Sequence, residues 1–133
     1  MVNRYLLDTH TFLWASYESR VFKLSDDAKR AIEDPETELY VSSVSLFEIT
    51  NKYRIGKLPE YRPIAEDCTE ALISLETKEL PLDWKQAHLA GGMDWPHKDP
   101  FDRLLAAQAQ SEDLTLITCD KAFDDAPGVN TLW

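Results

Sequence analysis

The chain has 133 residues and a formal net charge of −10, from 14 Lys and Arg against 24 Asp and Glu. This is the length of one ordinary domain, so we expect a single domain over residues 1–133. The acidic balance argues against nucleic-acid binding through a broad basic surface, because that mode needs Lys and Arg to neutralise phosphates. Contact with a polyanion would need local help, and divalent cations held by carboxylates would supply it.

No window of the sequence approaches 18 apolar residues, and Asp8 interrupts the short N-terminal apolar run. We therefore expect neither a membrane span nor a signal peptide. The two cysteines, Cys68 and Cys119, lie far apart and form no CxxC motif. We expect buried free thiols rather than a disulfide, which suits a reducing, cytoplasmic location.

The beginning of the chain predicts a strand and two helices. Arg4–Leu7 is a short apolar run typical of a buried strand. Asp8 and Thr9 follow it as the cap of a helix, with Thr9 as the N-cap residue. Ser25 is expected to cap a second helix, which ends at Pro35.

The middle of the chain repeats this order. Leu39–Ser42 predicts a second strand. Ser45 and Glu48 fit the S-x-x-E capping box of a helix that runs to Gly56. A further helix is expected over residues 63–75, before the third strand.

The last part of the chain predicts three strands and two helices. Asp83 is expected to cap a helix that Gly91–Gly92 stop, and Asp99 caps the next one, with proline at its first position. The proline in the third strand confines it to a sheet edge. The three strands are Leu80–Leu82, Leu114–Thr118 and Val129–Trp133. Short strands alternating with helices predict an α/β fold, a three-layer α/β/α sandwich around a short parallel sheet.

Acidic residues recur where the predicted strands end. Ligands of open parallel sheets bind beyond the carboxyl ends of the strands. Four segments bring acids to this edge, and these are Asp8, Glu48, Asp99 with Asp102, and Asp120. Clustered carboxylates repel one another unless protons or cations intervene, and oxygen ligands without a Cys or His cluster favour Mg²⁺ or Mn²⁺ over zinc. Such a site suits phosphodiester hydrolysis by a metal-activated water.

Each acid taken alone also has a structural explanation. Asp99 fits a helix N-cap, Glu48 fits the capping box, and Asp102 lies in a first helical turn, where acids are favoured. Asp8 and Asp120 are harder to explain in this way, because an acid at the end of an apolar strand is desolvated unless something pairs with it. The coincidence of all five is the informative observation.

The polar neighbours of these acids are less specific. Thr118 either orients a ligand or water or is an ordinary strand residue. His10 and His97 act as general acids or bases, or else lie on the surface or in packing contacts. Arg103 either meets phosphate or pairs with an acid.

Five sequence segments are familiar as a set. They are LLDTHTFLW (Leu6–Trp14), VSSVSLFEI (Val41–Ile49), GKL (Gly56–Leu58), HKDPFDRLLAAQA (His97–Ala109) and LITCDKAF (Leu116–Phe123). In this order they resemble PIN-domain proteins, and among these the VapC-type toxins of bacterial toxin–antitoxin pairs. The likeness covers essentially the whole chain, and the HKDPFDRLLAAQA block is its most specific part.

The resemblance implies a PIN-like domain and an endoribonuclease that needs Mg²⁺ or Mn²⁺ and cuts structured RNA in single-stranded loops. It also implies a homodimer that a cognate antitoxin inhibits by laying a peptide across the active site. We expect the catalytic residues to be Asp8, Glu48, Asp102 and Asp120. We expect the metal to be bound by Asp8, Asp99, Asp102 and Asp120, with Thr9 and Thr118 in support.

Two rival functions remain at this point. A phosphatase of the haloacid-dehalogenase type also begins with an Asp at a strand end, but it needs a second Asp two positions later, where this chain has His10. A non-catalytic PIN-like module would keep the acids for RNA or antitoxin contacts without turnover. The complete acid set favours the nuclease over this module.

Overall fold

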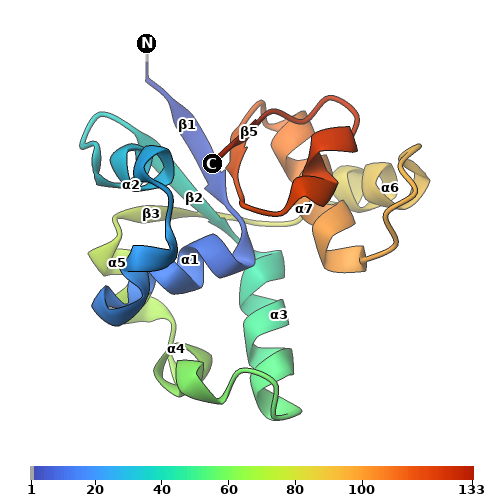
Figure 1. Ribbon diagram of the computed structural model, residues 1–133. Helices are drawn as coiled ribbons and strands as arrows, with labels where there is room; N and C mark the ends of the chain where they lie inside the picture. Colours follow the sequence, from blue (N-terminus) through green and yellow to red (C-terminus); the bar gives the residue numbers. More distant parts are fainter. Residues whose placement is uncertain (1) are drawn as a thin grey trace.

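The computed structural model describes residues 2–133, in which five short strands alternate with helices (Figure 1). The elements are β1 (Arg4–Leu7), α1 (Thr9–Ser16), η1 (Glu18–Lys23), α2 (Asp26–Glu33), β2 (Glu38–Ser42), α3 (Ser43–Arg54), η2 (Pro59–Tyr61), α4 (Arg62–Glu66), α5 (Thr69–Ser74), β3 (Thr77–Leu80), α6 (Trp84–Gly92), α7 (Pro100–Ser111), β4 (Thr115–Ile117), η3 (Lys121–Asp125) and β5 (Thr131–Leu132), where η marks a 3₁₀ helix. No helix within residues 2–133 is long and apolar enough to cross a membrane.

The five strands form one parallel sheet in the order β3-β2-β1-β4-β5. The register places Leu7 at the end of β1 beside Val41 of β2 and Ile117 of β4. The Asp8 amide then continues the ladder by donating to the Ile117 carbonyl at 3.2 Å. The central strands therefore end at one level, and the residues that follow them meet at the same edge.

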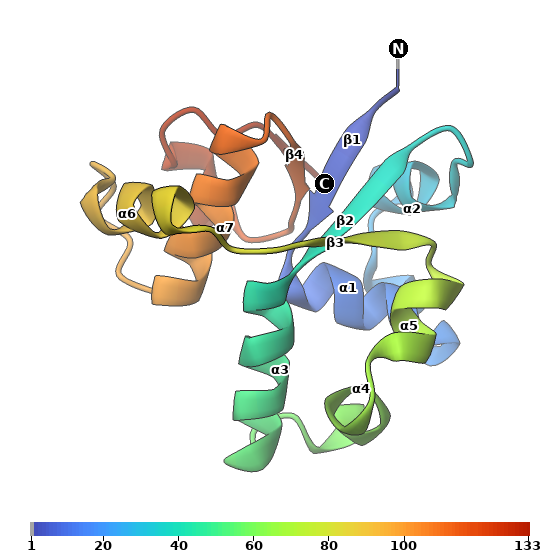
Figure 2. The same ribbon diagram turned by 180° about the vertical axis from the view of Figure 1, so that it is seen from behind.

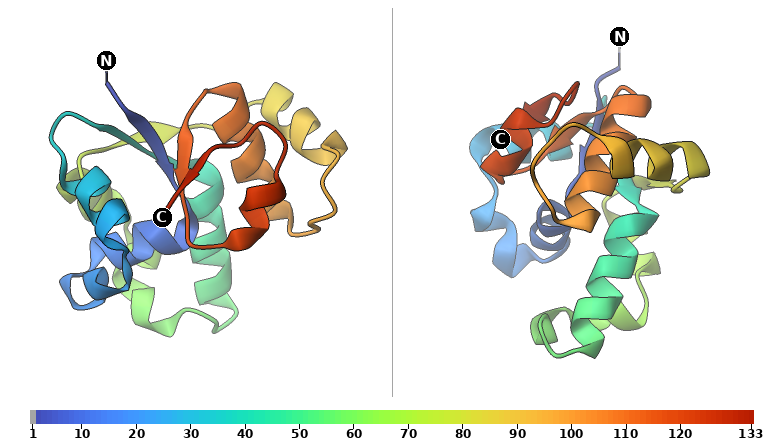
Figure 3. Two further views of the ribbon diagram at one scale, coloured as in Figure 1. Left: turned by 45° about the horizontal axis from the view of Figure 1, so that its top comes forward. Right: turned by 90° about the vertical axis from the view of Figure 1, so that its right-hand side faces the viewer.

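Alternate residues of the strands face two separate cores. Leu6 and Leu116 are fully buried against α6, α7 and η3, whereas Leu7 and Ile117 are fully buried against α1, α2 and α4. Figures 2 and 3 show α6 and α7 on one side of the sheet and α1 and α2 on the other. The predicted three-layer α/β fold is confirmed.

Helix α3 extends beyond the carboxyl edge of the sheet (Figures 1 and 2). The capping box predicted at Ser45 and Glu48 is wrong, because Ser42 caps this helix by accepting from the Val44 amide at 3.0 Å. Ser42 is the last residue of β2 and directly precedes the helix, so its hydroxyl occupies the capping position and Ser45 does not. Ser45 and Glu48 consequently lie inside the helix, and both are buried.

The prediction of Thr9 as an N-cap is also wrong. Asp8 caps α1, since its Oδ1 accepts from the Thr11 amide at 2.7 Å. Thr9 is the first residue of the helix, and its buried hydroxyl is free to bond elsewhere. The caps predicted at Ser25, Asp83 and Asp99 are confirmed.

Three predicted boundaries and the burial of the cysteines need correction. The helix expected over residues 63–75 is split into α4 and α5, where the Asp67 side chain accepts from the Thr69 amide. The third strand ends before Pro81 rather than including it, because proline has no amide for the ladder. Gly91–Gly92 end α6 from inside the helix. Cys68 and Cys119 are free as predicted, but Cys119 is exposed and Cys68 only half-buried.

Arg103 on α7 stabilises the loop between α6 and α7 through hydrogen bonds. Its guanidinium donates to four backbone carbonyls at 2.6–2.9 Å, and these belong to Ala90, Met93, Trp95 and His97. The predicted pairing of Arg103 with an acid is therefore not found among residues 2–133, whereas its predicted contact with phosphate stays a prediction. The residue holds the loop that leads into Asp99 and Asp102.

Candidate active site

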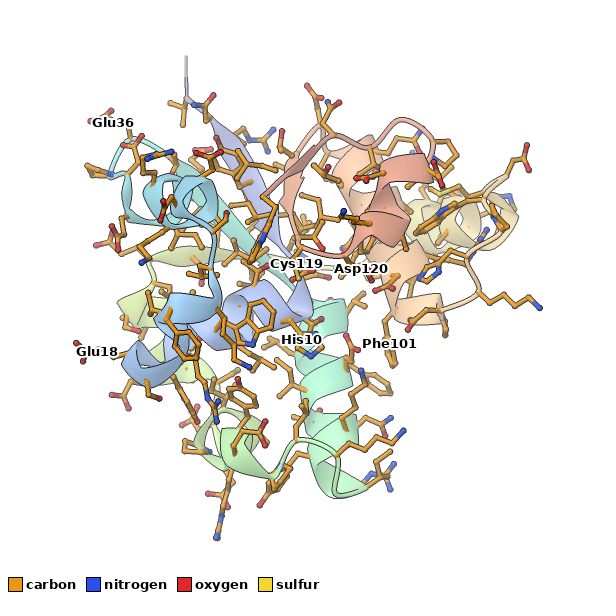
Figure 4. All side chains as sticks on the ribbon, in the orientation of Figure 1. His10, Glu18, Glu36, Phe101, Cys119 and Asp120 are labelled. Atoms are coloured by element: carbon orange, nitrogen blue, oxygen red, sulfur yellow. The ribbon has the colours of Figure 1, made fainter. Side chains whose placement is uncertain are left out.

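A pocket of about 440 Å³ lies at the carboxyl edge of the sheet. The acids expected there line it together with neighbours from α1, α3 and the segment after β4. The lining residues are Asp8, Thr9, His10, Trp14, Glu48, Lys52, Asp99, Asp102, Cys119 and Asp120. In Figure 4, His10, Cys119 and Asp120 lie at the centre of the molecule, whereas Glu18 and Glu36 project from its periphery.

Asp8 is one of the two buried acids of the pocket and is only 8% exposed. Burial raises the pKa of its carboxyl above the ordinary value, and hydrogen bonds with Thr118 and Thr11 oppose this shift without cancelling it. The charged form is therefore poorly solvated in the folded protein. A cation in the pocket would compensate this charge.

Glu48 on α3 is buried, and two neighbours bind its carboxylate. Its Oε1 accepts from the Thr9 hydroxyl at 2.6 Å, and its Oε2 pairs with Lys52 Nζ at 2.5 Å. The Thr9 hydroxyl also lies 2.9 Å from the Ser45 hydroxyl. Thr9 thus has a contact with a predicted site residue, and Lys52 provides the positive charge that a buried carboxylate needs.

Asp102 and Asp99 stand at the start of α7. Asp99 is exposed and caps the helix by accepting from the amides of Phe101 and Asp102. Asp102 Oδ2 lies 2.7 Å from His97 Nε2. The pKa of Asp102 is raised to about 6, chiefly by desolvation and also by the charges of Asp99 and Asp120, while the His97 contact opposes the shift.

Asp120 follows β4 and is exposed. Its side chain caps η3 by accepting from the Ala122 amide, and its own amide donates to the Thr118 hydroxyl at 3.0 Å. Thr118 is buried, so this hydroxyl fixes the turn that carries Asp120 into the pocket. Cys119 lies between them, and partial desolvation together with the charges of Asp8 and Asp120 raises the pKa of its thiol. The thiol therefore stays protonated at neutral pH, which disfavours it as a ligand for a soft metal.

The side chains of the pocket suit a hard divalent cation in chemistry and charge. Their donors are carboxylate oxygens, and a cation would offset both the desolvation and the repulsion from Asp99 and Asp120 that raise the pKa of Asp102. Within residues 2–133, however, no three His, Cys, Asp or Glu side chains stand close enough to hold one ion as they are placed. The reason is that Asp8, Asp99 and Asp120 accept backbone amides, Glu48 is bound to Thr9 and Lys52, and Asp102 is bound to His97. A cation would therefore require carboxylates to move closer together, and it could use oxygens that these partners leave free, such as Oδ1 of Asp102.

Sequence reasoning missed two features of the pocket. Lys52 is the single Lys or Arg among the described residues that line the pocket. Its position four residues after Glu48 on a helix could have predicted their ion pair. The contact between His97 and Asp102 had no such signal, because a loop and a helix start bring them together. His10 lines the pocket and contacts Trp14 with its ring tilted, the ring centroids lying 5.8 Å apart.

Comparison with known families decides where the chain belongs. A family model described as the PIN domain matches residues 5–129. The chain belongs to the PIN-domain family. This agrees with the resemblance in the sequence and with the parallel sheet observed here. No curated protein sequence matches the chain.

Solved structures with a similar fold come from toxin–antitoxin complexes. A chain of VapBC2 from Rickettsia felis bound to a promoter DNA fragment aligns with TM-score 0.69 at 19% identity, covering 97% of each chain. A chain of DNA-bound VapBC from Salmonella typhimurium aligns with TM-score 0.69 at 20% identity, covering 99% of this PIN domain and 98% of that chain. A toxin–antitoxin complex from Klebsiella pneumoniae aligns with TM-score 0.59 at 20% identity, covering 94% of each chain.

Proposed function

We propose that this PIN domain is a Mg²⁺- or Mn²⁺-dependent endoribonuclease that acts as the toxin of a toxin–antitoxin pair. One observation carries the proposal. Asp8, Glu48, Asp99, Asp102 and Asp120 come from four separate segments and line a single pocket at the carboxyl edge of the sheet. Five carboxylates in one pocket repel one another unless cations offset part of their charge, which favours a function that uses cations.

In this proposal the acids divide into two groups. Asp8, Asp102 and Asp120, with Asp99 at the rim, would hold the metal through their carboxylate oxygens. When bound, the metal would supply an activated water and would stabilise charge on the scissile phosphate. Glu48 lines the same pocket, and Thr9 and Lys52 each bind one of its two oxygens. From there it would orient the attacking water and accept its proton.

RNA is the substrate that we propose, and its single-stranded loops are the sites of cleavage. A net charge of −10 leaves little positive charge to grip a duplex along its length. Cleavage of an exposed, unpaired RNA segment would require only that one phosphodiester enter the acid pocket, where the bound cation would offset its charge. Lys52 would meet the phosphate there as the positive side chain of the pocket.

The proposed inhibitor is a cognate antitoxin with a cationic segment. An arginine from such a partner would replace the metal by charge-assisted hydrogen bonds to Asp8, Asp102 and Asp120. Beside the acid pocket lies an apolar pocket of about 330 Å³, lined by Ser43, Val44, Phe47, Leu82, Phe101 and Leu104, which suits the apolar residues of the same segment. We further propose that the protein is a cytoplasmic homodimer.

The non-catalytic binding module is the alternative function, and one observation favours it. Each of the five acids accepts a hydrogen bond within the protein, so its side chain already has a fixed partner without a metal. A binding module would keep these contacts in all states.

RNA cleavage with and without a divalent ion separates the two functions. We expect purified protein to cut a structured RNA in the presence of Mn²⁺ and to stop when EDTA is added. The products should map to unpaired loops on a sequencing gel. Binding of the RNA without cleavage at any Mn²⁺ concentration would establish the module instead.

A further inference from the structure

His97 makes a direct contact with one oxygen of Asp102. The distance from Nε2 to Oδ2 is 2.7 Å, within the range of a strong hydrogen bond. An ionised carboxylate only accepts, so Nε2 is the donor. Asp102 lines the acid pocket, whereas His97 does not. One oxygen of Asp102 is therefore directed out of the pocket toward His97.

The imidazole of His97 is itself held firmly. Its ring lies against Trp95, with centroids 4.8 Å apart, and Trp95 packs in turn against Phe123 at 5.7 Å. Trp95 is only 5% exposed and belongs to the core. The backbone of His97 is fixed as well, because its carbonyl accepts from the Arg103 guanidinium at 2.9 Å. Ring and backbone are thus both anchored, one to the core and one to α7.

We propose that His97 is a positioning residue that orients Asp102 for metal binding. By binding Oδ2, the imidazole would leave Oδ1 as the oxygen available to a cation in the pocket. This inference rests on the proposed function, since it requires Asp102 to be a metal ligand. The hydrogen bond, rather than the ring stacking on Trp95, is the part that matters.

The chemical reason is the freedom that Asp102 would otherwise have. Among residues 2–133, no other hydrogen bond to the Asp102 carboxylate is found. Without His97 the carboxylate would rotate, and binding a metal would then cost the entropy of fixing it. Donors behind metal ligands typically contribute about 10–100-fold to metal affinity.

Two variants separate the hydrogen bond from the stacking. His97→Phe keeps a flat ring against Trp95 and removes the donor, and His97→Gln keeps an N–H donor near the position of Nε2 and removes the ring. We expect calorimetric titration to show Mn²⁺ binding about 10–100-fold weaker in His97→Phe. His97→Gln should recover most of the affinity. His88→Phe, an exposed histidine on α6, is the matched control and should bind as the unmodified protein does.

A double variant covers the case in which His97→Phe weakens the fold. In a background carrying Asp102→Asn, His97→Phe should cause no further loss of Mn²⁺ affinity, because the bond that it removes acts only through Asp102. Equal loss in both backgrounds, or equal affinity in the unmodified protein and His97→Phe, would overturn the role of His97. Failure of the unmodified protein to bind Mn²⁺ at all would instead overturn the proposed function.

Discussion

Replacing Asp8 or Asp120 by Asn is expected to lower the rate of metal-dependent RNA cleavage by about 10³-fold, equivalent to about 4 kcal/mol of transition-state stabilisation. Asn keeps the shape of the side chain and a carbonyl oxygen that can still accept from the Thr11 or Ala122 amide. It removes the negative charge that would hold the cation. The measurement is the single-turnover cleavage rate of a structured RNA at saturating Mn²⁺.

The same variants should remain folded. Burial raises the pKa of Asp8, which means that the folded state disfavours its charged form at neutral pH. Replacement by a neutral Asn removes this penalty, so the melting temperature without metal should be unchanged or higher. Asp94→Asn, in the exposed loop before α7, is the matched control and should keep both activity and stability. Full activity of Asp8→Asn and Asp120→Asn would exclude the proposed metal site.

Replacing Arg103 by Met is expected to lower the free energy of unfolding by about 2–4 kcal/mol. Arg103 donates to four carbonyls of the loop between α6 and α7, and a methionine of similar length satisfies none of them. Arg103→Lys should recover only part of the loss, because one ammonium group cannot span the planar fork. Urea unfolding, followed by tryptophan fluorescence, measures the change.

The control for Arg103 is an arginine with an exposed partner. Arg62 pairs with Glu66 one turn along α4, and both side chains are largely exposed. Arg62→Met should therefore cost less than about 1 kcal/mol. If Arg103→Met cost no more than Arg62→Met, the four carbonyl bonds would not be what fixes the loop.

Position along the chain was enough to predict which acids share the pocket. Strand boundaries are visible in sequence, and parallel strands deliver the residues after them to one edge. Asp8 and Asp120 follow β1 and β4, so their meeting depends on topology alone. Asp99 was readable for a different reason, since an Asp before a proline is a strong helix start.

Contacts between side chains of different elements were not predictable in the same way. The bond from Thr9 to Glu48 depends on α3 beginning at Ser43, and two serines competed as its cap. Ser42 prevails because β2 ends there, which is a property of the sheet rather than of the helix. The carbonyl contacts of Arg103 depend on the path of a loop that carries no periodic pattern.

Calorimetric titration with Mn²⁺ at pH 7 and pH 5 tests the acid pocket most directly, using the unmodified protein, Asp102→Asn and Asp94→Asn. The raised pKa of Asp102, about 6, means that its carboxyl becomes protonated as the pH falls through this value and must lose a proton to bind metal. We expect the unmodified protein and Asp94→Asn to bind Mn²⁺ at pH 7 and about tenfold more weakly at pH 5. Asp102→Asn should bind about 10–100-fold more weakly at pH 7, since one ligand charge is lost. Equal affinities in all three proteins would show diffuse binding to an acidic surface and would contradict a metal site in this pocket.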